Sequence, residues 1–369
     1  MPATIAQNHG PVGLQQIRED GCLTYIVWDK TTHDAVVVDP SAAALAEVRE
    51  VLQEHGLKLV AIVETHTHAD HPSGSHSLRE ETGAKVLMGR GTRSARADRL
   101  VSTGEVVAFG SQELRVVETP GHTPDSICLL YGDSERPICA MTGDTLMIGS
   151  TGRTDFPSAD PAALFHSLRV LDDQLLPATR ILPAHDYSDL LFSLWGVERE
   201  RNEQVRISDI STFVAMKREE SLAVLTDAVL KLIEFNLSAD PGELPRTGTG
   251  SGVAACGAAL QNLERVPAIN VQKYAPKLDT HARGDLFIDV RESAEFAGGR
   301  IPGTENIPLS ELALHWERLV GAGKIYLSCQ SGRRSQMAAR TLDRLGLTGV
   351  VNVSGGFQAW SNAGFPIEK

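Results

Sequence analysis

The sequence predicts an α/β protein made of two domains. Its 369 residues, of which 42% are hydrophobic, are enough to bury two cores and too many for one core of the usual size. Short apolar runs typical of strands alternate with segments of helical period. A stretch without charged residues, 247–263, consists mainly of Gly, Ala, Ser and Thr and indicates a junction between the domains.

The predicted elements follow in order along the chain. Two apolar runs, 23–28 and 35–38, flank the polar segment 29–34 and predict a hairpin. Helical period is found at 45–52, 162–176, 222–233 and 336–342. Short apolar runs that predict strands are found at 59–63, 114–117, 138–141, 180–182 and 324–328. Several of these runs end next to a His or an Asp.

Residues 65–71 contain three histidines and one aspartate and follow the apolar run 59–63 directly. Side chains two positions apart on a strand share a face, so His66 and His68 point the same way, and the turn brings Asp70 and His71 round. Neutral imidazole and carboxylate together suit zinc, iron or manganese. A solvated loop would need a chance cluster from the chain's 12 histidines. The segment therefore predicts a metal site.

Three later residues lie where a strand-like run ends and could close such a site. They are His122, Asp144 and His185. A single histidine beside a strand is more often an ordinary core or surface residue. In combination with residues 65–71, the three indicate further ligands.

This ordered set resembles the metallo-β-lactamase superfamily over roughly residues 10–240. The resemblance implies an αββα sandwich, in which two mixed sheets are flanked by helices. Seven positions of the superfamily's ligand pattern are occupied here: His66, His68, Asp70, His71, His122, Asp144 and His185. A di-zinc thioester hydrolase of the glyoxalase II type therefore stays open on ligands alone.

Two segments around these ligands, 152–156 and 183–187, look like the persulfide dioxygenase branch of the superfamily. This resemblance implies one Fe(II) per chain, held by His66, His122 and Asp144. Two histidines and one carboxylate leave positions open for oxygen and substrate. By the same resemblance, the other four residues, His68, Asp70, His71 and His185, orient ligands and substrate or serve as alternative metal ligands.

The resemblance also implies a substrate, glutathione persulfide, which O₂ oxidises to sulfite and glutathione. Arg153 and Tyr187 would bind glutathione, because a guanidinium grips a carboxylate and a phenol donates a hydrogen bond. The alternative for Arg153 is an ion pair with Asp155. Residues 149–151 lack a cysteine that some relatives carry there, so the thiol chemistry beside the substrate is expected to differ.

A second candidate site lies near the C-terminus, where the run 324–328 leads into Cys329. The following helix places Cys329 in a loop at a helix N-terminus, and Arg333 and Arg334 add positive charge. Such surroundings favour the thiolate, so we expect Cys329 to be nucleophilic rather than an inert buried thiol. This part resembles rhodanese over residues 267–369. The resemblance implies that Cys329 carries sulfane sulfur between thiosulfate or sulfite and glutathione.

Composition limits the partners and the compartment. A formal charge of -12 argues against a nucleic-acid partner. Five cysteines, an odd number without Cys-x-x-Cys spacing, favour a reducing compartment, and residues 1–11 do not read as a secretory signal, so we expect the cytoplasm. Residues 247–263 are too short and small-sided for a membrane span. A homodimer is possible at the level of the family.

The sequence thus predicts a persulfide dioxygenase domain at 1–245, a linker at 246–266 and a rhodanese sulfurtransferase domain at 267–369. Residues 250–255 are a variant of the glycine-rich dinucleotide-binding motif. No predicted strand precedes them, so we interpret them as linker. Two alternatives stay open: the di-zinc hydrolase with an appended sulfur carrier, and a sulfur-responsive sensor whose metal fold is catalytically silent.

Overall fold

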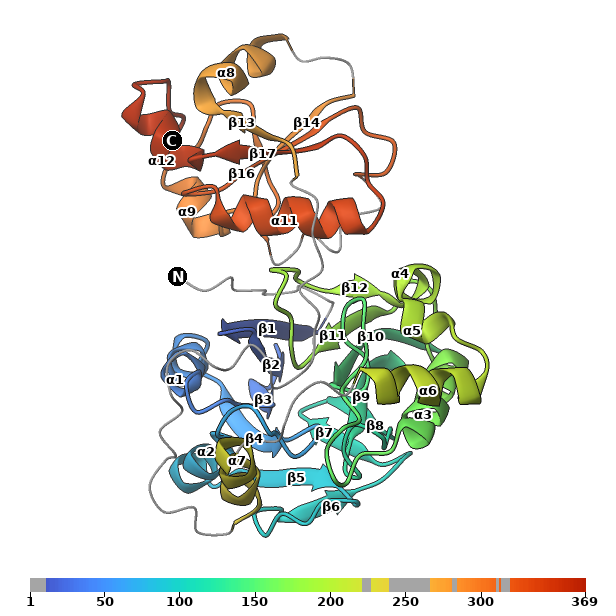
Figure 1. The fold of residues 1–369 in the computed structure, drawn as a ribbon. Coiled ribbons are helices and arrows are strands. Elements are labelled where there is room, and N and C mark those ends of the chain that lie inside the picture. Colours follow the sequence, from blue (N-terminus) through green and yellow to red (C-terminus); the bar gives the residue numbers. More distant parts are fainter. Residues whose placement is uncertain (1–10, 221–226, 239–265, 281–283, 310–311, 313–318) are drawn as a thin grey trace. The chain divides into compact units, whose positions relative to one another are not determined.

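The structure is a computed structural model that describes residues 11–220, 227–238, 266–280, 284–309, 312 and 319–369 (Figure 1). The described residues form two compact units. The larger contains 11–187 and the described residues between 192 and 238, and the smaller contains 188–191 and those from 266 onward. Of the predicted linker at 246–266, only Val266 lies within the described residues, so the linker's bounds stay a prediction.

The first sheet of the larger unit has six strands in the order β1-β2-β3-β4-β5-β6. They are β1 (Val12–Glu19), β2 (Cys22–Asp29), β3 (Asp34–Val38), β4 (Lys58–Val63), β5 (Lys85–Gly89) and β6 (Arg99–Val101). The first three strands pair antiparallel, and β3 to β6 pair parallel. The predicted hairpin is confirmed, because β2 and β3 pair with Tyr25 opposite Val38.

The second sheet also has six strands, in the order β12-β11-β10-β9-β8-β7. They are β7 (Val106–Phe109), β8 (Gln112–Glu118), β9 (Ile127–Asp133), β10 (Arg136–Gly143), β11 (Arg180–Pro183) and β12 (Ser193–Leu194). All pairs are antiparallel except β10 with β11. Both sheets are mixed, as predicted, and β7 contacts β3 and β4 of the first sheet.

Helices cover each sheet and complete two cores. On the first sheet, Val48 of α1 (Leu45–Glu54) and Leu78 of α2 (Ser75–Thr82) pack in one cluster with Ile62 of β4. On the second, Leu168 of α3 (Pro161–Gln174) packs with Ile181 of β11. Also present are α4 (Trp195–Arg201), α5 (Glu203–Arg206), α6 (Ile210–Glu219) and α7 (Asp227–Leu237). The layers confirm the predicted αββα sandwich.

The predicted helices at 45–52 and 162–176 correspond to α1 and α3. α3 begins where it does because the Asp160 carboxylate accepts the N–H groups of Ala162 and Ala163, and proline occupies its first position. The apolar spacing at 222–233 falls partly on α7, while 222–226 lie outside the described residues. Among the helices that the structure describes, none combines the length and apolar character needed to cross a membrane.

The smaller unit contains a parallel sheet with the strand order β13-β17-β16-β14-β15. The strands are β13 (Ala268–Asn270), β14 (Leu286–Asp289), β15 (Glu305–Asn306), β16 (Ile325–Ser328) and β17 (Val350–Ser354). The helices are α8 (Val271–Thr280), α9 (Ser293–Ala297), α11 (Arg333–Arg344) and α12 (Gly356–Asn362). Tyr274, Tyr326 and Trp360 belong to its core. The strand predicted at 324–328 and the helix at 336–342 correspond to β16 and α11.

Candidate metal centre and candidate thiol site

Strand ends position the candidate metal centre. The loop after β4 carries His66, and the loops after β8, β10 and β11 carry His122, Asp144 and His185. A close approach of backbone is required here: a Cβ added to Gly152 would lie 2.2 Å from the Asp144 carbonyl oxygen and 2.9 Å from the His122 ring. The glycine of the 152–156 segment thus lets this loop fold against two of the predicted ligands.

The structure brings His66, His122 and Asp144 together into one buried group, called the triad below. One donor atom from each lies within 4.8 Å of the others. Oδ2 of Asp144 is 3.8 Å from Nε2 of His66 and 3.5 Å from Nε2 of His122. Each of the three residues is at most 2% exposed. Two imidazoles and one carboxylate are the donor set that non-haem Fe(II) sites use.

The protonation pattern of the triad fits a bound cation. Nδ1 of His122 lies 2.8 Å from the carbonyl oxygen of Arg153 and must donate to it, which leaves the lone pair on Nε2. Nδ1 of His66 faces Oγ1 of Thr65, whose own proton goes to Asp39, so His66 also keeps its lone pair on Nε2. Burial lowers the pKa of both imidazoles, which favours the neutral, ligating form.

Asp144 supplies the charge of the triad. Its Oδ1 accepts a hydrogen bond from Nδ1 of His185 at 2.7 Å, while its buried Oδ2 has no hydrogen-bond partner among the described residues. Burial by itself would raise the pKa of this carboxyl group, but the imidazoles of His185, His66 and His122 outweigh burial and lower it. An ionised oxygen without a partner, beside two imidazole lone pairs, is the environment that a metal ion satisfies.

His68 lies beside the triad and is held by two carboxylates that the sequence analysis missed. Its Nε2 is 3.2 Å from Oδ1 of Asp39 and 3.1 Å from Oε2 of Glu64. Burial lowers the pKa of His68, but hydrogen bonds and charge from Asp39 and Glu64 raise it well above its ordinary value overall. One signal was available for Asp39, which follows the apolar run 35–38 as the other site residues follow theirs.

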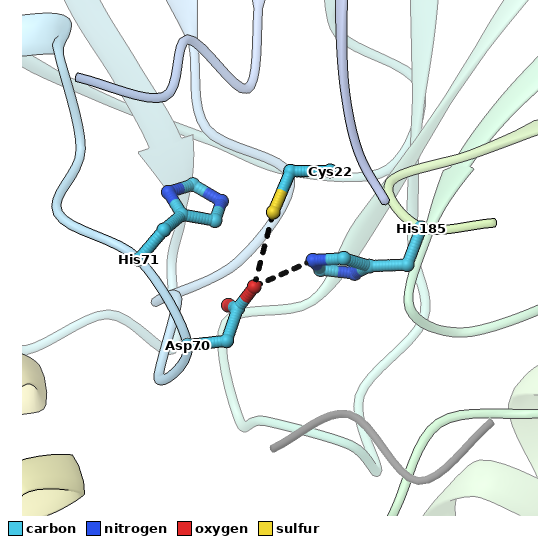
Figure 2. A group of neighbouring side chains, drawn as sticks. All are labelled: Cys22, Asp70, His71 and His185. Carbon is cyan, nitrogen blue, oxygen red and sulfur yellow. Dashed lines mark hydrogen bonds and ion pairs between the residues drawn. The ribbon is translucent and has the colours of Figure 1, made fainter. Parts of the chain in front are cut away.

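A second group lies on the far side of His185 from Asp144. Figure 2 shows Asp70, His71 and His185 with Cys22, which the sequence analysis did not place at any site. Nε2 of His185 is 2.7 Å from Oδ2 of Asp70, so its two ring nitrogens connect Asp70 to Asp144. The thiol of Cys22 donates to the same Asp70 oxygen at 3.4 Å. A cysteine at the start of a strand gives no sequence signal for this position.

The two predicted glutathione contacts, Arg153 and Tyr187, lie next to these groups. Arg153 forms the ion pair that was its alternative interpretation, with Nε and Nη2 at 2.8 and 2.5 Å from the Asp155 carboxylate. The Tyr187 ring is stacked on His185, with 6.1 Å between centroids and 10° between planes. A role for either residue in binding glutathione stays a prediction.

A cavity of about 220 Å³ flanks the triad. Thr67 and Thr123, the chain neighbours of His66 and His122, line it together with Phe156. The rings of Phe156 and His122 are in edge contact, with 5.5 Å between their centroids. The opposite wall is formed by α7, including Leu230 and Ile233. The cavity is therefore mainly apolar and lies beside two of the predicted ligands.

The candidate thiol site of the smaller unit is built around Cys329. Cys329 follows β16, is 1% exposed and precedes α11. Its Sγ accepts a hydrogen bond from the backbone N–H of Gly332 at 3.1 Å. Oγ of Ser335 lies 3.4 Å from the same sulfur, but its one proton goes to Oδ1 of Asn352 at 2.7 Å. Backbone packing is tight as well, because a Cβ on Gly356 would lie 2.0 Å from the Cys329 carbonyl oxygen.

The two arginines beside Cys329 differ in their surroundings. Arg334 makes a bidentate ion pair with Glu295, at 2.6 and 2.8 Å, and this raises the pKa of its guanidinium. Arg333 is exposed at the first position of α11. The structure thus brings a positive helix end to Cys329, as predicted, but assigns Arg334 a carboxylate partner.

The fold and the site together define the class. The model of the metallo-beta-lactamase superfamily matches residues 17–214, and that of the rhodanese-like domain matches residues 273–363. The chain belongs to the metallo-beta-lactamase superfamily and carries a C-terminal rhodanese domain, which confirms both resemblances.

Within the superfamily the chain is similar to persulfide dioxygenases. It is 35% identical to mitochondrial persulfide dioxygenase ETHE1 of Mus musculus over 201 residues, 54% of this chain and 78% of that protein. The crystal structure of ETHE1 from Myxococcus xanthus matches with a TM-score of 0.55 and 30% identity, over 61% of this chain and 96% of that one.

Hydrolases are also among the relatives. A hydroxyacylglutathione hydrolase of Rhodospirillum rubrum is 32% identical over 208 residues, 55% of this chain and 78% of that protein. A metallo-beta-lactamase structure from Staphylococcus aureus covers 93% of this chain and 100% of its own, with a TM-score of 0.58. At 21% identity, this last match shows the fold alone.

Proposed function

We propose that the larger unit oxidises glutathione persulfide with O₂ to sulfite and glutathione, and that the smaller unit transfers sulfane sulfur through Cys329. The observation that carries the first activity is the triad, in which two neutral imidazoles face one carboxylate oxygen that has no hydrogen-bond partner among the described residues. The relationship to persulfide dioxygenase ETHE1 supports it.

His66, His122 and Asp144 would hold one Fe(II). When bound, ferrous iron supplies open positions for persulfide and O₂ and exchanges electrons with both. The protein's own groups prepare this site: the carbonyl of Arg153 fixes the His122 tautomer, and His185 occupies the second oxygen of Asp144. Oxidation of sulfane sulfur from zero to plus four releases four electrons, the number that one O₂ accepts, so the reaction needs no external reductant.

Glutathione persulfide would bind between Tyr187 and Arg153, whose polar groups can hold the glutathione part. Tyr187 presents its phenol beside His185, and Arg153 lies over the Phe156 ring, 5.1 Å from its centroid. The guanidinium of Arg153 would need to share its contacts with Asp155 when a glutathione carboxylate binds.

In the smaller unit, the Cys329 thiolate would attack the outer sulfur of thiosulfate. The S–S bond of thiosulfate breaks, sulfite leaves with the electron pair, and a persulfide remains on Cys329. The backbone N–H of Gly332 donates to this sulfur and would stabilise its negative charge before attack. Glutathione would then take the outer sulfur, and the reverse direction, from persulfide to sulfite, uses the same groups.

Metal analysis combined with an oxygen electrode tests the dioxygenase. Protein purified from iron-sufficient cells should contain one iron per chain and consume one O₂ for each sulfite formed from glutathione persulfide. A protein with two zinc ions per chain that hydrolyses thioesters and ignores oxygen would contradict the proposal.

The second candidate function is the di-zinc thioester hydrolase. It is favoured by the second group, since Asp70, His71 and His185 lie together beside the triad, and by the similarity to a hydroxyacylglutathione hydrolase. The measurement above separates the two functions, because a hydrolase needs no oxygen and an oxygenase needs no second metal ion.

A further inference from the structure

We propose that Asn236 of α7 is a positioning residue of the metal centre, because its side-chain amide holds the main chain of the loop that carries His66. This loop, residues 64–74 between β4 and α2, is called the ligand loop below. The proposal rests on the proposed function only in assuming that the triad binds a metal ion, whichever metal that is. The sequence analysis did not place Asn236 at any site.

The amide of Asn236 makes three hydrogen bonds to main-chain groups of the ligand loop. Nδ2 donates to the carbonyl oxygens of His68 and His71, each at 2.9 Å, and Oδ1 accepts the N–H of Ser73 at 2.9 Å. The two ends of the amide are distinguished by these partners, because a carbonyl oxygen only accepts and a backbone N–H only donates. Asn236 is 5% exposed, so water competes little for these bonds.

Asn236 holds the second half of the ligand loop, and Asp39 holds the first half. The Asp39 carboxylate accepts the N–H of Thr65 at 2.6 Å and the Thr65 hydroxyl at 2.7 Å. A buried main-chain group without a partner is costly, so each of these bonds restricts the path of the loop. His66 lies between the two supports. Its main chain is therefore fixed on both sides by residues that are not themselves predicted metal ligands.

The C-terminal end of α7 is also held in place, which makes Asn236 a rigid support. The carbonyl oxygen of Asn236 accepts a hydrogen bond from Oγ of Ser94 at 3.1 Å. The guanidinium of Arg96 donates to the Ser238 carbonyl at 2.7 Å and also to that of Phe235. The last carbonyl groups of a helix have no partner within the helix, so these side chains supply the donors that α7 lacks.

The same helix forms a wall of the cavity beside the triad. Leu230, Ile233 and Leu237 recur at helical spacing and line this cavity, whereas Asn236 faces the ligand loop. α7 is thus both a wall of the site and the support of its loop. A shift of α7 would move the main chain next to His66, and metal sites depend on groups that orient their ligands.

Cobalt(II) titration of the metal-free full-length protein, in competition with a chromophoric chelator, measures this effect without oxygen or substrate. Asn236→Leu removes all three hydrogen bonds, and Asn236→Asp removes the two that Nδ2 donates. Both variants should bind Co²⁺ about 10–100-fold more weakly, the usual cost of losing a group that orients a ligand. The visible absorption of bound cobalt should also change shape, because it reports the coordination geometry.

Lys231→Gln is the matched control for this titration. It lies at an exposed position of the same helix and changes the charge of the protein by the same amount as Asn236→Asp. Its cobalt affinity and absorption should equal those of the wild type. An equal loss of affinity in Lys231→Gln would show that any change in α7 weakens the site, and would overturn the assignment to Asn236.

Amide hydrogen exchange of the metal-free wild type gives a second readout that does not depend on how the variants fold. The Ser73 amide should exchange slowly, because Oδ1 of Asn236 accepts its proton. Exchange should stay slow in Asn236→Asp, whose carboxylate also accepts, and become fast in Asn236→Leu. Fast exchange of this amide in the wild type, or wild-type cobalt affinity in both Asn236 variants, would overturn the proposal.

These measurements separate the inference from the proposed function. A protein that shows both effects of Asn236 but consumes no oxygen with persulfide would reject the proposed function and leave the role of Asn236 standing. A protein that consumes oxygen as proposed, while both Asn236 variants bind cobalt like the wild type, would reject the inference alone.

Discussion

His185 donates its Nδ1 proton to Oδ1 of Asp144 at 2.7 Å, and this bond determines which carboxylate oxygen is available at the triad. With Oδ1 occupied, Oδ2 faces His66 and His122. His185 is fully buried with its partner, so no solvent competes for this hydrogen bond. The orientation of the Asp144 carboxylate thus depends on His185, which is not one of the three predicted iron ligands.

Replacing His185 should weaken metal binding at the triad. In His185→Ala the Asp144 carboxylate loses the partner that orients it, and changes of this kind lower metal affinity by about 10–100-fold. Iron occupancy after dialysis against a weak chelator is the measurement. His166→Ala, at an exposed position of α3, is the control and should retain iron like the wild type. Equal iron retention in both variants would refute the orienting role.

Iron binding should resist moderate acid. Burial is the main cause that lowers the pKa of His66 and His122 below the ordinary value of 6.5. Protons displace a metal from imidazole only below the imidazole's pKa, so the lowered values move the loss of iron to lower pH. Equilibrium dialysis over a pH series should show iron retained as the pH falls through 6.5. A loss with its midpoint at 6.5 would contradict this assignment.

Gly152→Ala should disrupt the metal centre. The new methyl group would meet the Asp144 carbonyl oxygen at 2.2 Å and the His122 ring at 2.9 Å, so the loop has to move and take the ligands with it. We expect iron content and oxygen uptake to fall together by at least about tenfold, since a shift near 1 Å is costly at a site that requires exact positioning. In Gly298→Ala the nearest atom is 3.5 Å away, and both quantities should stay unchanged.

Cys329→Ser should abolish sulfur transfer from thiosulfate and leave oxygen uptake on added glutathione persulfide mostly intact. Thiosulfate-dependent sulfite release and an oxygen trace measure the two activities on the same preparation. Loss of both activities in Cys329→Ser would show that the two sites depend on each other.

The candidate metal-site residues could be predicted from the sequence because their pattern is local. His66, His68, Asp70 and His71 lie within one loop, and His122, Asp144 and His185 each follow a short apolar run. A side chain that directly follows a strand can turn towards a site at the edge of the sheet. The apolar runs and the polar residues after them therefore indicated at which end of the strands the candidate site lies. The compartment and a possible homodimer stay predictions from composition and family.

Contacts between distant segments could not be predicted in this way. Arg334 was predicted to add positive charge beside Cys329, and its ion pair with Glu295, which is 39 residues away, had no signal in the sequence. This pairing depends on which loops are neighbours in space.

The sequence by itself determined the two domains, the classes of fold and the seven candidate ligands, because periodicity and strand ends are local properties of the chain. Only the tertiary structure decided which ligands meet and which groups hold them. Asp39 reaches His68 from another strand, and Cys22 reaches Asp70 across 48 residues because the hairpin pairs with the loop that carries His185. No local pattern records such pairings, since they arise when both sheets fold around the site.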